Sequence, residues 1–239
     1  MIRHAGRYDR LFYGGMAAAL GVTVFTGFAS SYYLSPFADG PGTTFSGGPF
    51  SALVHLHGVL FTLWVVLFIA QTALVARHRV GWHRRLGVAG GVLAAMMVVA
   101  GMALALSTAV RGGAPPGVDP LAFLAIPVFD MILFATFVTT ALATRRNRDA
   151  HKRLMLLAYI SIVVAAVARL DAALAGPIAS FGLTLLFIIV AAIYDRLSRG
   201  HLHSAYVWGG AAFVVSVPLR LFVSETSAWR SLAEALTRS

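Results

Sequence analysis

The chain has 239 residues, of which 59% are hydrophobic and only 12% are charged, and its mean hydropathy is +0.80. These values exclude an ordinary soluble domain and indicate an integral membrane protein, and the lack of cysteine excludes disulfides, iron–sulfur clusters and thiolate metal sites. The formal net charge of +10 would suggest nucleic acid as a partner of a soluble protein, but here it follows the turns between apolar segments, so we expect the lipid bilayer as partner and no nucleic acid.

Seven apolar segments each approach the roughly 20 residues that a helix needs to cross a bilayer. They cover residues 11–33, 51–76, 86–108, 121–144, 154–175, 177–195 and 205–224. The first follows basic residues, as a signal peptide does, but its apolar stretch is longer than in such peptides. We therefore predict an uncleaved helix, with six mature spans as the alternative. The predicted fold is an all-α, seven-transmembrane-helix bundle that forms a single domain.

The last residues, 225–239, follow the seventh span. Trp229, Leu232, Ala233 and Leu236 recur there at helical spacing. This pattern predicts a short amphipathic helix that lies on the outer surface of the membrane.

The basic residues predict the orientation of the bundle. Of the 19 Lys and Arg residues, 14 lie at the N-terminus and in the turns at 77–85, 145–153 and 196–203. The positive-inside rule then places the N-terminus in the cytoplasm and the C-terminus outside. We expect the inner membrane of a bacterium as the location.

An internal repeat links two of these basic turns. Residues Thr72–Gly87 and Thr140–Met155 share seven of sixteen positions at a constant offset of 68. Both segments connect an inward-going span to an outward-going one, which predicts a duplicated helical hairpin. The turn before the seventh span is a looser third version.

Histidines recur at these turns, and two interpretations remain open. His83, His151, His201 and His203 could share the polar interfacial layer with the basic residues that anchor the helix ends. Alternatively, they could converge as axial haem ligands or transition-metal ligands, because imidazole suits both.

The His-[Arg/Lys]-Arg-Leu turns that begin at His83 and His151 resemble those of small bacterial membrane families. Some of these families are similar to accessory factors of haem–copper oxidases or to membrane b-type cytochromes. The resemblance covers mainly the second to fifth spans. It implies a haem-linked or metal-linked accessory role, with haem b or a transition metal as cofactor, a respiratory-chain or other membrane protein as partner, and His55 as a further candidate ligand. Retinal is excluded because the only lysine, Lys152, lies in a turn.

Six ionisable side chains form a predicted polar cluster in the outer half of the membrane: His55, His57, Asp130, Arg169, Asp171 and Arg220. Such residues normally face the bundle interior. Asp130 lies deepest, and we predict Arg169 as its partner. His55 and His57 point about 200° apart on a regular helix, so they cannot both face one metal ion. Structural salt bridges and a ligand pocket both remain open interpretations of the cluster.

Three functions are compatible with these features, and no catalytic residue can be assigned. The first is a haem-binding or metal-binding accessory protein for electron transfer or oxidase maturation. The second is a proton-coupled small-molecule carrier or sensor, in which Asp130 titrates and His57, Asp171 and Arg220 line the entry. The third is an intramembrane metal-dependent hydrolase, which requires three converging ligands and an open fourth position.

Overall fold

The computed structural model describes residues 2–37, 50–170 and 177–238, and all regular secondary structure in these ranges is helical. The helices are α1 (Ile2–Gly27), α2 (Ala52–Ala76), α3 (Val80–Val110), the short α4 (Pro120–Phe123), α5 (Ala125–Ala143), α6 (Arg148–Val167), α7 (Pro177–Arg199), α8 (Ser204–Ser224) and α9 (Ser227–Thr237). A π-helical turn, Ala29–Tyr33, and a 3₁₀ turn, Ser35–Phe37, follow α1.

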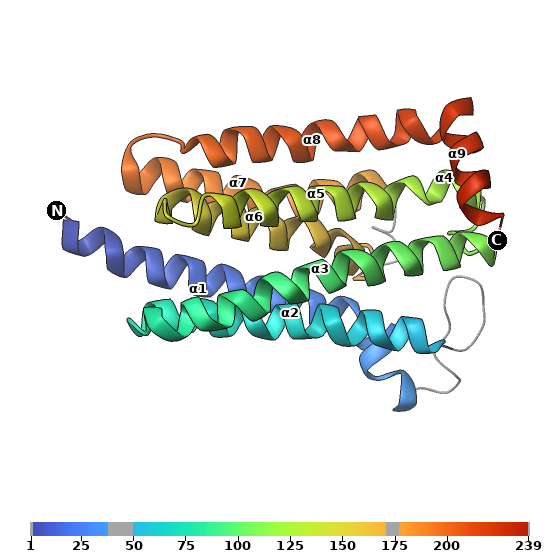
Figure 1. Ribbon diagram of the computed structural model, residues 1–239. Helices are drawn as coiled ribbons and strands as arrows, with labels where there is room; N and C mark the ends of the chain where they lie inside the picture. The colour runs from blue at the N-terminus through green and yellow to red at the C-terminus, as the bar shows by residue number, and fades with distance from the viewer. Residues whose placement is uncertain (1, 38–49, 171–176, 239) are drawn as a thin grey trace.

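The long helices lie side by side in one bundle (Figure 1). The predicted all-helical fold is confirmed, and six of the described helices are long and apolar enough to cross a membrane: α2, α3, α4 together with α5, α6, α7 and α8. The chain is therefore a multi-pass membrane protein. α1 is not among the six by the same measure of length and hydropathy.

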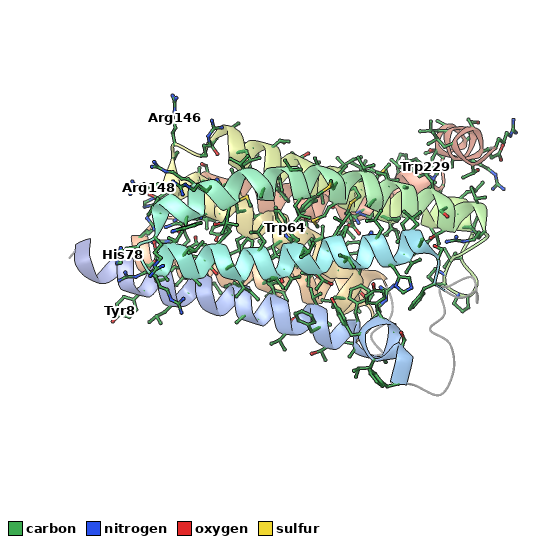
Figure 2. The ribbon with its side chains drawn as sticks, turned by 60° about the horizontal axis from the view of Figure 1, so that its bottom comes forward. Tyr8, Trp64, His78, Arg146, Arg148 and Trp229 are labelled. Atoms are coloured by element: carbon green, nitrogen blue, oxygen red, sulfur yellow. The ribbon has the colours of Figure 1, made fainter. Side chains whose placement is uncertain are left out.

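The two ends of the bundle differ in charge. One end, the basic end, holds the N-terminus and the turns between α2 and α3, α5 and α6, and α7 and α8, whereas the opposite end holds α4 and α9 (Figure 1). In Figure 2, His78, Arg146 and Arg148 lie at the basic end, Trp229 lies at the opposite end, and Trp64 lies between them.

Helix α6 is the central helix of the bundle. In its apolar window 72% of the residues are buried, against 22 to 39% in the other five spans, and α1, α5, α7 and α8 pack around it. α1 approaches α6 closely at Gly27, where a Cβ atom would overlap the carbonyl oxygen of Ala166. Only glycine permits this contact between the two backbones.

Three helices begin six or more residues earlier than predicted, and one of them is α1, which starts at Ile2 rather than at residue 11. α3 and α6 start at Val80 and Arg148, each six residues before the apolar segments that begin at residues 86 and 154. α6 continues through its basic turn because Lys152 and Arg153 find carboxylate partners within the bundle, as described below. The fourth span is interrupted at Leu124, since Pro127 has no N–H group for the carbonyl of the preceding turn.

Helix α9 packs across the opposite end. The Thr226 hydroxyl accepts from the Trp229 amide, which caps the helix, and the Trp229 indole donates to the Leu121 carbonyl at 2.8 Å. Trp229 and Ala233 are buried, whereas Leu232 beside them is exposed. α9 is thus amphipathic and docks against α3 and α4.

Candidate functional site

Asp130 of α5 forms an ion pair with Arg220 of α8, at 2.6 Å between Oδ1 and Nη1. Arg220 is completely buried, donates to the carbonyl and hydroxyl oxygens of Ser216 at 3.1 and 2.9 Å, and lies 4.5 Å from the centre of the Phe181 ring. The predicted pairing of Asp130 with Arg169 was wrong. Arg169 follows α6, which also packs beside α5, but its guanidinium lies against Ala165 and Phe28 instead.

Arg169 lies just beyond the end of α6 and points toward α1. Its Nη1 donates to the Ala165 carbonyl at 2.6 Å, and its guanidinium lies 4.6 Å from the centre of the Phe28 ring. Asp171, the remaining carboxylate of the predicted cluster, lies outside the described residues. The cluster is therefore divided, with Arg169 near α1 and the Asp130–Arg220 pair between α5 and α8.

The two histidines of α2 face different surroundings. His55 is exposed and lies within 3.5 Å of the Tyr32 hydroxyl, whereas His57 is partly buried and stacks on Phe61 at 3.9 Å between ring centres. The Nδ1 atom of His57 is buried without a hydrogen-bond partner among the described residues.

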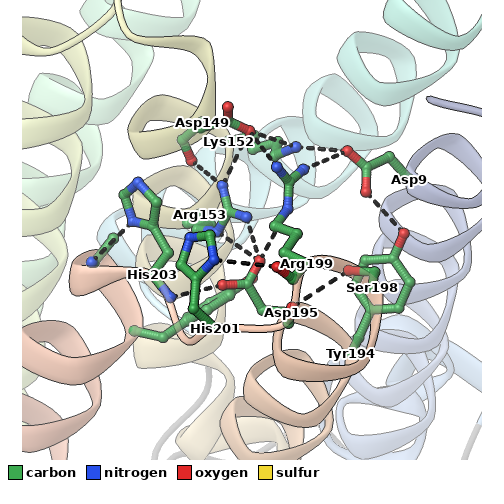
Figure 3. Close-up of polar contacts among 12 residues, drawn as sticks. Asp9, Asp149, Lys152, Arg153, Tyr194, Asp195, Ser198, Arg199, His201 and His203 are labelled. Atoms are coloured by element: carbon green, nitrogen blue, oxygen red, sulfur yellow. Dashed lines mark hydrogen bonds and ion pairs between the residues drawn. The ribbon is translucent and has the colours of Figure 1, made fainter. Parts of the chain in front are cut away.

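A second polar cluster, the latch, lies at the basic end and consists of Asp9, Asp149, Lys152, Arg153, Asp195 and Arg199 (Figure 3). Arg153 and Asp195 form its core and are both almost completely buried. The Arg153 Nε donates to Asp195 Oδ1 at 3.0 Å, and a second guanidinium nitrogen bonds the same oxygen. The Asp149 carbonyl accepts a further bond from Arg153 at 2.6 Å.

The latch also ties the N-terminal helix to the bundle. Asp9 of α1 accepts from Lys152 of α6 at 2.6 Å and from Arg199 and Tyr194 of α7 at 2.8 and 2.7 Å (Figure 3). Burial acts to raise the pKa of Asp9, but the hydrogen bonds from Lys152 and Tyr194 and the charges of Lys152 and Arg199 outweigh it, so its pKa lies below the ordinary value. The latch contains three carboxylates and three cations, a balance that suits a structural role.

His83 and His151 meet beside this cluster. They come from equivalent places in the sequence repeat, and their ring centres lie 6.3 Å apart with the ring planes at 78°. The His151 Nδ1 lies 2.8 Å from the Ala141 carbonyl oxygen. Because a carbonyl only accepts, this Nδ1 carries the proton, which leaves Nε2 as the available nitrogen of a neutral ring. The His83 Nδ1 is buried and has no partner among the described residues.

The other two candidate histidines have local roles. The His203 Nδ1 accepts from the Ala205 amide at 3.1 Å and so caps α8, and the His203 amide donates to Asp195 at 2.8 Å. Burial and the charge of Arg153 hold the pKa of His203 below its ordinary value. His201 is exposed beside the Arg199 carbonyl. Of the predicted ligands at the basic end, the structure brings His83 and His151 together.

A site with three protein ligands finds no support in the part of the chain that the structure describes. No group of three or more His, Asp or Glu side chains there could hold a metal ion. A closed zinc site needs four protein ligands and a catalytic one needs three. No family model, curated protein or solved structure matches this chain. Its function has to be inferred from its own residues.

The latch was not predicted, because its basic residues were interpreted only as a sign of the orientation of the bundle in the membrane. A signal was present, since Asp149 precedes Arg153 by four residues and Asp195 precedes Arg199 by four, the spacing that pairs side chains on one helix face. The long-range pair between Arg153 and Asp195 has no such signal in the sequence.

Proposed function

We propose that the chain crosses a bacterial inner membrane seven times, with α1 as the seventh span, the basic end in the cytoplasm and the C-terminus outside. α1 has 26 residues, about 39 Å of helix, which is long enough to span a bilayer. It buries Met16, Ala17 and Leu20 against the bundle, as an integral member of it would. The excess of basic turns at the end that holds its first residues supports the orientation.

We further propose that the α2–α3 hairpin and the hairpin of α4, α5 and α6 arose by duplication. α4 begins 68 residues after α2, and α6 begins 68 residues after α3, which is the offset of the sequence repeat. Thr72 and Thr140, also 68 residues apart, each donate to the carbonyl four residues earlier in their own helix. The agreement of helix starts and side-chain bonds supports a common origin.

We propose that the bundle binds a haem b or a transition metal between His83 and His151, and that it serves electron transfer or oxidase maturation alongside a respiratory-chain protein. The convergence of these two imidazoles is the observation that carries the proposal. A metal ion bound to a ring nitrogen at about 2.0 to 2.1 Å would lie roughly 3.2 Å from the ring centre, so two imidazoles on one ion would have centres up to about 6.4 Å apart. The observed 6.3 Å is close to this limit.

The number of available ligands favours haem or copper over zinc. A haem iron would need only two ligands from the protein, here His83 and His151, because the porphyrin would supply the others. The bond between His151 and the Ala141 carbonyl fixes the ring tautomer, as the outer bond of a metal-ligating histidine usually does. The Nδ1 of His83 has no such partner among the described residues. When bound, such a centre would supply one-electron transfer.

The protein around the pair holds it in position. Lys152 directly follows His151 and is fixed by Asp9, while Arg153 is fixed by Asp195. These ion pairs hold the first turn of α6, and with it His151, at a defined place relative to α1 and α7. A rigid pair of ligands is what a bound redox centre requires.

Absorption spectra and elemental analysis of the detergent-purified protein test the proposal. We expect a Soret band that sharpens and shifts on reduction with dithionite, or stoichiometric copper or another transition metal. His83→Ala and His151→Ala should each lower the cofactor content at least tenfold, whereas His201→Ala, at the same end of the bundle, should retain it. A wild-type protein without band or metal, or equal contents in all four proteins, would refute the proposal.

The two other functions have less support from the geometry. A carrier would need Asp130 to titrate, but its carboxylate is neutralised by the fully buried Arg220, which fits a structural ion pair better. A hydrolase would need a third metal ligand, which the described residues do not supply beside His83 and His151.

A further inference from the structure

Seven exposed arginines at the basic end take no part in the latch. They lie in and beside the two turns that the sequence repeat relates, the turn between α2 and α3 and the turn between α5 and α6. In Figure 2, Arg146 and Arg148 extend from the basic end. Together the seven form the arginine patch: Arg77, Arg79, Arg84, Arg85, Arg145, Arg146 and Arg148. Each half of the patch thus comes from one copy of the repeat.

The two halves of the patch are neighbours in the bundle. The ring centres of His83 and His151, which follow the two turns, lie only 6.3 Å apart. Farther along α3, a Cβ atom at Gly91 would lie 3.6 Å from Leu142 of α5, whose carbonyl oxygen accepts from Arg145 at 3.1 Å. A single ligand can therefore contact arginines of both turns.

No carboxylate neutralises the arginine patch within the described part of the chain. The carboxylates described at the basic end are Asp9, Asp149 and Asp195, and all three form ion pairs with cations of the latch. Because the seven arginines carry the same charge on neighbouring turns, they create a strong positive field. The patch therefore attracts anions from outside the chain.

The side chains of the patch suit a phosphate group. All seven are arginines, whose planar guanidinium groups can donate two parallel hydrogen bonds to one phosphate. Trp82, in the first turn of α3, is 56% exposed, and the Arg85 guanidinium lies 5.5 Å from the centre of its ring. An exposed tryptophan beside basic residues is typical of the level at which lipid headgroups lie.

The surface next to the patch suits acyl chains. Arg84, Val88 and Val92 follow one another at a spacing of four along α3, so they lie on the same face of the helix. Val88 and Val92 are 73% and 57% exposed. A cation followed by exposed apolar residues matches the order of headgroup and hydrocarbon in a phospholipid. This order favours a lipid over a soluble acidic protein as the ligand.

We propose that the arginine patch binds one phospholipid with two phosphate groups, of the cardiolipin class. Arginines of the α2–α3 turn bind one phosphate, those of the α5–α6 turn bind the other, and acyl chains lie along the exposed face of α3. A lipid with two linked phosphates is favoured over two separate lipids, because the second contact forms within the same complex. Basic surfaces at the ends of transmembrane helices bind such headgroups. This site goes beyond the proposed function and does not require a cofactor.

Native mass spectrometry of the purified, delipidated protein in detergent tests the proposal. With cardiolipin or dioleoylphosphatidylglycerol added at equal total phosphate, we expect one cardiolipin per chain to be retained, with a Kd at least tenfold lower than that of phosphatidylglycerol. Arg84→Gln/Arg85→Gln and Arg146→Gln/Arg148→Gln should each make the two Kd values nearly equal, because cardiolipin is then held by one phosphate. Arg230→Gln/Arg238→Gln is the matched control, since it removes the same charge from α9 at the opposite end and should keep the preference.

The possible outcomes separate a lipid site from its alternatives. Equal affinity of the wild type for the two lipids, or a preference that survives both double variants at the basic end, would overturn the proposal. Binding of soluble polyglutamate without any preference for cardiolipin, abolished by the same substitutions, would assign the patch to an acidic protein and would also overturn it. Loss of the preference with unchanged haem or metal content supports the lipid site by itself.

The test does not depend on the folding of any one variant. The substituted arginines of the patch are exposed, so both double variants should keep the circular dichroism spectrum of the wild type. If a double variant fails to fold, the single variants Arg85→Gln and Arg146→Gln decide the question, and each should lower the preference for cardiolipin at least threefold. A preference unchanged in both would contradict the site.

Discussion

Removal of the Asp130 charge should destabilise the bundle strongly. In Asp130→Asn the guanidinium of Arg220 would keep its bonds to Ser216 but lose its only carboxylate among the described residues. Arg220 is completely buried and cannot reach water without moving α8. Loss of one partner of a buried ion pair typically costs about 3 to 5 kcal/mol, and we expect a loss of unfolding free energy in this range.

The double variant Asp130→Leu/Arg220→Met tests what the complete ion pair contributes to the unfolding free energy. It removes both charges while keeping similar volumes, so it should be about as stable as the wild type or up to about 4 kcal/mol more stable. Unfolding by SDS in mixed micelles, followed by far-ultraviolet circular dichroism, would give the four free energies of the double-mutant cycle. A cost below about 1 kcal/mol for Asp130→Asn, or a double variant less stable than both single ones, would refute the reasoning.

Two further predictions concern the packing of α1. Gly27→Ala should lower the unfolding free energy by about 1 to 3 kcal/mol in the same assay, because the new Cβ overlaps the Ala166 carbonyl. Gly14→Ala, with open space around the new Cβ, should be neutral or slightly stabilising. Equal effects of the two substitutions would contradict the close approach of α1 and α6. Because the pKa of Asp9 is lowered in the folded protein, Asp9 contributes fully to stability above its ordinary pKa of 3.8, and this contribution is lost as the pH falls further. Asp9→Asn should therefore be less stable than the wild type at pH 7, and the stabilities of the two proteins should converge on acidification. Parallel stability curves from pH 7 to pH 2 would contradict this role of Asp9.

Hydropathy predicted the helices because the cost of exposing the backbone in lipid leaves little alternative to a helix of about 20 apolar residues. The predicted segment 51–76 and the helix Ala52–Ala76 nearly coincide. The ends were less predictable where charged residues continue a helix, as Arg153 does at the start of α6. Its charge argues for a turn, but its pairing with Asp195 buries it completely.

Most contacts between helices could not be predicted from the sequence. The residue number gives the depth of Asp130 in the membrane, but not the direction in which α5 presents it, so the sequence predicted Arg169 as its partner where the structure has Arg220. The meeting of His83 and His151 was left open for the same reason, and only the repeat hinted that the two would lie at one level.

The distance in sequence between Asp130 and Arg220 has a consequence for biosynthesis. The two residues are 90 positions apart, and a ribosome that adds about 5 to 20 residues per second needs roughly 5 to 20 seconds to reach the second after the first. During that interval α5 must enter the membrane with a carboxyl group that has no arginine beside it, at a cost of roughly 2.5 to 3.5 kcal/mol. The mean hydropathy of 2.3 in this span, equal to the highest among the six, is what allows insertion before the partner has been synthesised.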